Sequence, residues 1–74
     1  MNWRDRITVD YKIMLGKPII KSTRITIELI LKKLSEGMSE NELLEGYPAL
    51  SHDDIMAALS YSADVISKEE LVAI

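Results

Sequence analysis

The stretch GKPIIKSTRITIELIL, from Gly16 to Leu31, decides how this chain folds. Its first half is short and rich in β-branched residues up to Thr26, which is typical of a strand. Its second half changes period, and apolar residues now recur at the i, i+3, i+4 and i+7 spacing of a helix face: Ile27, Ile30, Leu31 and Leu34. One continuous segment is therefore predicted to leave a small sheet, turn, and begin a helix.

Helix-start signals follow towards the C-terminus. Each pairs a serine with an acid three residues later, as in a capping box: Ser39 with Glu42, Ser51 with Asp54, and Ser67 with Glu70. Thr26 is a competent N-cap for the first helix, and Gly37 is suited to end it in a left-handed conformation. The second and third helices are predicted over residues 40–45 and 52–66, and a short turn or helix is expected after them.

The third helix is predicted to bury one face, made of Ile55, Ala58, Leu59, Ser62, Ala63 and Ile66. Helices joined by tight turns after a small β element indicate an α+β fold. The expected architecture is a short N-terminal β element followed by a three-helix, helix-turn-helix-like bundle, and a winged form is left open. We expect one domain over residues 1–74, with a β-rich part (1–26), three helices (27–66) and a C-terminal tail (67–74).

The N-terminal part contains a second strand signal. Ile7, Val9 and Tyr11 alternate with polar residues, the period of a half-buried strand. Its partner strand should begin at Pro18 or run along an edge, because proline cannot donate to a ladder. Trp3 is expected in a loose lead-in, either docked on the body of the domain or used in an interface.

Two stretches carry a family resemblance. GKPIIKSTRITIELIL resembles the signature GKPxIxGTRIPVxxIL of the small bacterial and archaeal family catalogued as domain of unknown function 433. EGMSENELLEGYPALSHDDIMAAL, residues 36–59, resembles the second motif of the same family, in which a Gly-x-Ser/Thr turn leads to Tyr-Pro and then to a helix of the AAL type. The resemblance covers roughly residues 7–65. It implies an antitoxin-like protein with a helix-turn-helix-type fold, of a kind often encoded beside a nuclease-like toxin.

The sequence departs from the family motif at three places. Asp10-Tyr11 stands where the family usually has Asp-Pro, and Thr26 stands where it has proline. Ser22 replaces the family's glycine. If this position requires a positive φ, Ser22 is strained; if it does not, Ser22 and Thr23 make an ordinary polar turn.

Length and composition limit the class of protein. A chain of 74 residues without cysteine has neither disulfides nor thiolate metal sites to stabilise a small core. With 47% hydrophobic residues and no Phe, that core must be aliphatic. Burial in an oligomer is the usual remaining source of stability, so a homodimer is predicted. No apolar run approaches the roughly 18 residues of a membrane span, and no signal peptide is evident, so a cytoplasmic protein is expected.

Charge is unevenly distributed along the chain. Residues 1–37 hold eight Lys or Arg against four acids, a local charge of +4, whereas residues 38–74 hold one Lys against eight acids, a local charge of −7. This asymmetry indicates different partners for the two halves, or one half meeting the other across a dimer. A solvated surface that is simply unevenly charged is the alternative.

His52, Asp53 and Asp54 form the one cluster that resembles a site. Adjacent residues on a helix do not share a face, and acids at a helix start already serve the cap and the dipole, so a structural role is favoured. There is no second His, no Cys and no nucleophile–base pair. We therefore expect no enzyme activity, no cofactor and no small-molecule substrate.

Binding to DNA is predicted to be weak. Carboxylates at the start of the third helix repel phosphates, so that helix is poorly suited to the major groove. Contacts should instead come from the basic half: Lys12, Lys17, Lys21, Arg24, Lys32 and Lys33. For Arg24 in particular, an ion pair with Glu28 or Asp10 is favoured over a ligand contact.

The favoured function is that of a non-catalytic, macromolecule-binding protein, antitoxin-like by resemblance, that pairs with a nuclease-type toxin. A DNA-binding transcriptional regulator and a simple oligomerisation module are the alternatives. Acids near the C-terminus could occupy a basic nuclease cleft, and the apolar end of the tail could dock as a short helix. The residues predicted to face the partner are Asp64, Glu69, Glu70, Leu71 and Ile74. Folding back of the tail on its own domain or dimer mate is the alternative.

Overall fold

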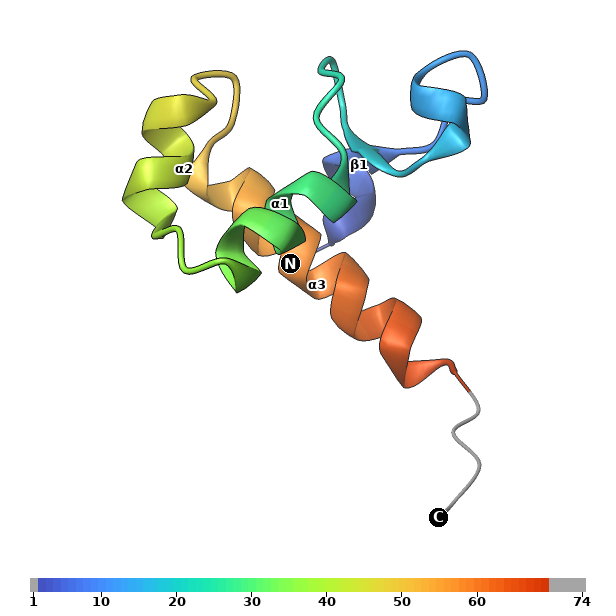
Figure 1. Cartoon of the computed structure of the whole chain (residues 1–74). Helices are drawn as coiled ribbons and strands as arrows, with labels where there is room; N and C mark the ends of the chain where they lie inside the picture. Colours follow the sequence, from blue (N-terminus) through green and yellow to red (C-terminus); the bar gives the residue numbers. More distant parts are fainter. Residues whose placement is uncertain (1, 70–74) are drawn as a thin grey trace.

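The computed structural model describes residues 2–69. The elements follow in the order η1 (Trp3–Asp5), β1 (Ile7–Thr8), η2 (Met14–Gly16), β2 (Ile19–Ile20), α1 (Ile27–Ser35), α2 (Glu40–Gly46) and α3 (His52–Ser67), where η marks a 3₁₀ turn. A two-stranded antiparallel sheet followed by three helices confirms the predicted α+β fold. Figure 1 shows α3 passing α1 and continuing away from the body, with α2 at one side and the N-terminal loops at the other.

The sheet is shorter than predicted. β1 pairs with β2 only through Ile7 opposite Ile20 and Thr8 opposite Ile19, so the predicted strand through Val9 and Tyr11 is wrong beyond residue 8. The chain leaves the sheet at Asp10, whose side-chain oxygen accepts the backbone N–H of Lys12 at 2.9 Å. An aspartate that bonds the backbone two residues on forms a turn in competition with a ladder.

The predicted start and end of α1 are confirmed. The hydroxyl of Thr26 accepts the backbone N–H of Leu29 at 3.0 Å, so threonine caps the helix. The N–H of Ile27 donates to the carbonyl of Pro18 at 3.0 Å, which ties the first turn of the helix to the strand before it. Gly37 follows the helix with φ of 95°, a conformation that glycine adopts without steric cost.

Two of the three predicted capping boxes are present. Ser39 with Glu42 begins α2, and Ser51 with Asp54 begins α3. The third predicted box pairs Ser67 with Glu70, which lies outside the described residues. Ser67 itself is the last residue of α3, and its hydroxyl donates to the carbonyl of Asp64 at 2.8 Å.

The α2 capping box makes stability depend on pH. The pKa of Glu42 lies below its ordinary value of 4.5, chiefly because the carboxylate accepts the backbone N–H of Ser39 at 3.1 Å. A carboxyl whose pKa is lower in the folded state contributes stability above the unfolded pKa and loses it as the pH falls through the folded one. Glu42→Gln is therefore expected to lose less stability than the wild type on acidification below 4.5. Urea unfolding at several pH values measures this, and identical pH profiles for the two proteins would contradict it.

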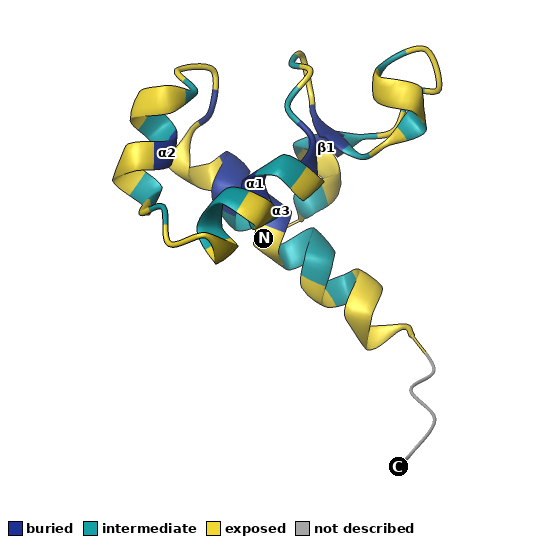
Figure 2. Cartoon of the chain, in the orientation of Figure 1, coloured by how far each residue is buried: buried dark blue, intermediate teal, exposed yellow. Residues whose placement is uncertain are grey.

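The core lies where α1, α2, the sheet and the first half of α3 meet (Figure 2). It is aliphatic, as predicted, and consists of Ile7, Ile20, Ile27, Ile30, Leu43, Leu50, Ile55, Ala57 and Ala58. Tyr47, Met38 and Met56 pack against it from partly buried positions. The C-terminal half of α3 therefore contributes no residue to the buried core.

The predicted buried face of α3 is only partly right. Ile55 and Ala58 are buried as expected, but Leu59, Ala63 and Ile66 are exposed. The helix instead turns Asp54 and Ala57 inward, where Asp54 serves the cap and Ala57 is small enough for close packing. Apolar residues lie on more than one face of α3, so the helical spacing of apolar residues does not by itself determine which face packs against the core.

The N-terminal turn docks on α3 rather than forming the loose lead-in that was predicted. The indole N–H of Trp3 donates to a carboxylate oxygen of Asp64 at 2.6 Å. Its ring meets that of Tyr61 edge-on, with centroids 4.9 Å apart. Of the two roles considered for Trp3, docking on the body of the domain is the one observed.

Ser22 adopts a positive φ of 65°, so the strained alternative holds at this position. A left-handed conformation costs an L-residue about 1–2 kcal/mol, whereas glycine adopts it freely. Ser22→Gly is expected to raise the free energy of unfolding by about 1 kcal/mol, measured by urea denaturation. The matched control is Ser35→Gly in α1, which should lower stability by about 0.5 kcal/mol. Destabilisation by Ser22→Gly would contradict the assignment of strain.

Candidate functional site

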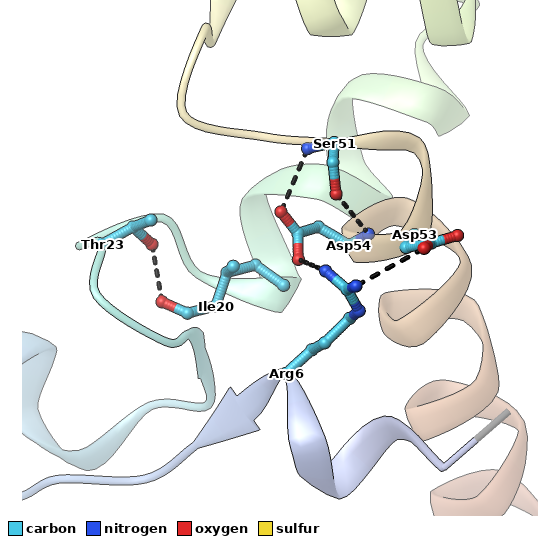
Figure 3. A network of polar contacts seen from close by, with 6 residues as sticks. All are labelled: Arg6, Ile20, Thr23, Ser51, Asp53 and Asp54. Atoms are coloured by element: carbon cyan, nitrogen blue, oxygen red, sulfur yellow. Dashed lines mark hydrogen bonds and ion pairs between the residues drawn. The ribbon is translucent and has the colours of Figure 1, made fainter.

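The acidic start of α3 is held by the N-terminal half of the same chain (Figure 3). Asp54 is buried; one carboxylate oxygen accepts the backbone N–H of Ser51 at 3.0 Å, and the other accepts from the guanidinium of Arg6 at 3.1 Å. The same guanidinium lies 3.4 Å from the carboxylate of Asp53. His52 Nδ1 lies 2.6 Å from Glu40 Oε1. The His52–Asp54 cluster therefore links α3 to η1, β1 and α2, which is the structural role favoured for it.

Residues 2–69 contain no group of three or more His, Asp or Glu side chains placed to hold a metal ion. Within the same residues, no helix has both the length and the apolarity needed to cross a membrane.

The basic residues divide between the N-terminal loops and α1. Lys12 and Lys17 flank η2 in the loop between β1 and β2, and Lys21 and Arg24 lie in the turn between β2 and α1. All four side chains are exposed, and Figure 1 shows the loop and the turn projecting at the same end of the molecule. The fold thus brings together four of the six basic residues predicted to contact DNA.

The two lysines of α1 lie in different places. Lys32 lines a shallow hollow of about 220 Å³ together with Lys17 and Met14 of the loop. Lys33 lines another hollow together with Glu36 and Glu42. Lys32 can therefore join the basic end of the molecule, whereas Lys33 belongs to a surface of mixed charge.

The ion pair predicted for Arg24 is wrong within residues 2–69. Glu28 pairs instead with Lys17, whose ammonium lies 2.8 Å from its carboxylate. This hydrogen bond and charge lower the pKa of Glu28. Asp10, the other predicted partner of Arg24, accepts a backbone N–H in its own turn. Lys17 pairs with Glu28 because Lys17, which is extended before Pro18, lies beside the first turn of α1.

A polar cleft of about 430 Å³ separates the loop from the turn. Its walls are Thr8, Asp10, Ile13, Ile19, Ser22, Thr23 and Arg24. Arg24 and the hydroxyls of Thr8 and Ser22 can donate to an anionic oxygen there, whereas the hydroxyl of Thr23 already donates to the carbonyl of Ile20 at 2.7 Å.

An apolar groove of about 340 Å³ runs between α1 and α3, and we call it the α1–α3 groove. It is lined by Pro18, Ile27, Glu28, Leu31, Tyr61, Ser62, Val65 and Ile66. Val65 and Ile66 are 41% and 59% exposed, so nothing within residues 2–69 covers this part of α3. The groove was not predicted, although the excess of apolar residues in the second half of α3 is the signal that indicates it.

The predicted partner-facing residues have different surroundings. Asp64 is half-buried and accepts the indole N–H of Trp3, so its carboxylate already has a use within the chain. Glu69 is exposed just beyond the end of α3. Glu70, Leu71 and Ile74 lie outside the described residues.

Comparisons with known proteins bear on the fold and the family. A comparison with the curated proteins finds no match. Among solved structures, the chain is similar to a DUF433 member protein from Anabaena variabilis ATCC 29413, with a TM-score of 0.81 and 26% sequence identity over 88% of this chain. The chain spans 64% of the length of that protein. The model of the family described as "Protein of unknown function (DUF433)" matches residues 7–62, and the chain therefore belongs to the DUF433 family.

Proposed function

We propose that this protein acts without catalysis by binding another protein through the α1–α3 groove, as the antitoxin-like partner of a nuclease-type toxin. The observation that carries the proposal is the groove itself. Val65 and Ile66 line it near the C-terminal end of α3 and are exposed to solvent. Figure 1 shows this end of α3 continuing away from the body of the domain. Exposed apolar surface rimmed by polar residues is typical of a site for protein–protein contact.

The shape of the groove favours a protein over a small molecule. It is open along its length and lies between two helices, Ile27–Ser35 and His52–Ser67. A groove of this kind takes an amphipathic helix, whose apolar side chains enter it at helical spacing. Small molecules are bound in more enclosed pockets with convergent polar groups.

The charges around the groove favour a basic partner. Glu69 is exposed beyond its α3 end, and Glu28 forms part of its wall, although Glu28 is paired with Lys17. These acids belong to a chain whose residues 38–74 carry a local charge of −7. A nuclease attracts a polyanion to a basic or metal-loaded cleft, so carboxylates on its inhibitor raise the encounter rate and select the partner. We place this encounter in the cytoplasm.

The first experiment uses the protein encoded beside this chain. We expect the neighbouring reading frame to encode a small nuclease-like protein, and we expect that product, once purified, to bind the wild type and to lose its nuclease activity on binding. Titration calorimetry and a nuclease assay measure the two effects. A neighbouring product that neither binds nor is inhibited would sink the proposal.

A second copy of the chain is the other occupant that the groove could take, and it would give the homodimer that length and composition predict. Sedimentation equilibrium at micromolar concentration distinguishes the two occupants. If the chain dimerises through the groove and the nuclease binds elsewhere, the protein is an oligomerisation module at this surface.

DNA binding is the second candidate function, and the basic loop and turn favour it. Lys12, Lys17, Lys21 and Arg24 are exposed at one end of the molecule. The start of α3, in contrast, presents Asp53 and Asp54 to Arg6. In this chain, DNA contacts are therefore expected from the loop and the turn rather than from the start of α3.

A further inference from the structure

The loop between β1 and β2 has an unusual backbone. Met14, Leu15 and Gly16 have successive φ values of 51°, 56° and 79°, all left-handed, although only the last is glycine. Hydrogen bonds hold this turn, since Gly16 N–H donates to the carbonyl of Ile13 and Lys17 N–H to that of Met14, each at 3.1 Å. The loop is therefore a defined but strained structure, and strain of this kind concentrates at functional sites.

Burial does not explain the strain. Leu15 is 91% exposed and Tyr11 is 86% exposed, so neither large side chain adds to the core. The ring of Tyr11 lies on the backbone of Gly16, where an added Cβ would come within 2.8 Å of Tyr11 Cδ1. Gly16 thus allows the tyrosine ring to approach the loop backbone closely while most of the ring stays exposed. The left-handed turn presents an apolar and aromatic tip to solvent.

Positive charge surrounds the tip. Lys12 and Lys17 flank it in sequence, Lys17 in its ion pair with Glu28, and Arg24 lies across the polar cleft, beside the hydroxyl of Ser22. Asp10 is the one carboxylate lining that cleft, and one of its oxygens already accepts the backbone N–H of Lys12. The surface is therefore complementary to a row of phosphates.

We propose that the β1–β2 loop is a wedge for duplex DNA. Leu15 and Tyr11 enter the minor groove, while Lys12, Lys21 and Arg24, which are exposed in the loop and in the turn, contact the phosphates on either side. Proteins that bind the minor groove frequently insert an apolar side chain between base steps while cationic side chains hold the backbone. An acidic protein partner would also complement the positive charge of the loop, but its binding would not require the exposed apolar side chain of Leu15. This inference rests on the second candidate function, DNA binding, and its site is separate from the α1–α3 groove.

The test removes the apolar tip and keeps the backbone. Asparagine tolerates the left-handed region better than leucine, so Leu15→Asn should retain the loop. Binding is measured by fluorescence anisotropy on a labelled A·T-rich duplex at about 50 mM salt, where phosphate contacts are strong. We expect Leu15→Asn to weaken binding at least tenfold with no loss of thermal stability. The matched control, Leu59→Asn, changes an exposed leucine of α3 and should bind like the wild type.

The charge contacts are tested separately. Lys12→Ala and Lys21→Ala should each reduce the slope of log K against log salt by about 0.9, the value for one phosphate contact in duplex DNA. Lys68→Ala, at the far end of α3, should leave the slope unchanged. The proposal is overturned if Leu15→Asn binds the duplex as tightly as the wild type, or if the wild type does not bind it at all. It is equally overturned if Leu15→Asn impairs binding of a protein partner and not of DNA.

Discussion

Ile30→Ala is expected to lower the free energy of unfolding by about 3 kcal/mol. Ile30 lies in α1 and is 0% exposed, in contact with the core formed by the sheet and the other helices. Removing three buried carbons costs their transfer free energy and leaves a cavity that the surroundings fill only in part. A domain of this size has roughly 4–11 kcal/mol of stability in all, so the variant should unfold at much lower urea concentration.

The control for this prediction is another large-to-alanine change on a helix. Leu59→Ala, at a position 42% exposed, should cost less than about 1 kcal/mol. Urea denaturation followed by circular dichroism measures both variants. If Ile30→Ala cost no more than Leu59→Ala, α1 would not be central to the core.

Ile66→Glu is expected to weaken binding of the nuclease-like partner at least 100-fold, which is about 2.8 kcal/mol. Ile66 lines the α1–α3 groove and is 59% exposed, so the new carboxylate is solvated in the free protein. In the complex it would be buried against apolar side chains, where an unpaired charge is strongly unfavourable. Stability of the free domain should change by less than about 0.5 kcal/mol.

Leu59→Glu is the matched control for the groove. Leu59 is an exposed apolar residue of the same helix but does not line the groove, so partner binding should persist. Sedimentation of both variants reports on self-association at the same time. Loss of a dimer by Ile66→Glu with unchanged nuclease binding would assign the groove to a second copy of the chain.

Local signals in the sequence predicted the helices well. Thr26, Ser39 and Ser51 each cap a helix through their own side chain, and Gly37 ends α1. Such caps depend on residues within one turn of each other, so they can be read from sequence alone. The family resemblance was confirmed as well.

What the sequence did not reveal depends on contacts between distant segments. The indole of Trp3 donates to Asp64, 61 residues away, so the predicted loose end is a docked turn. The same contact engages the carboxylate of Asp64, which was predicted to face a partner. Arg6 meets Asp54 in the same way, at a separation of 48 residues. The α1–α3 groove exists only once the crossing of the two helices is fixed, and no local pattern determines that crossing.

The central claim is that a partner protein binds in the α1–α3 groove, and isotope-labelled protein tests it most directly. On titration with the purified nuclease-like product of the neighbouring gene, the account predicts that the amide resonances of Leu31, Val65 and Ile66 shift, whereas those of Tyr11 and Leu15 stay in place. Shifts confined to the β1–β2 loop, or no shifts at saturating partner, would contradict it.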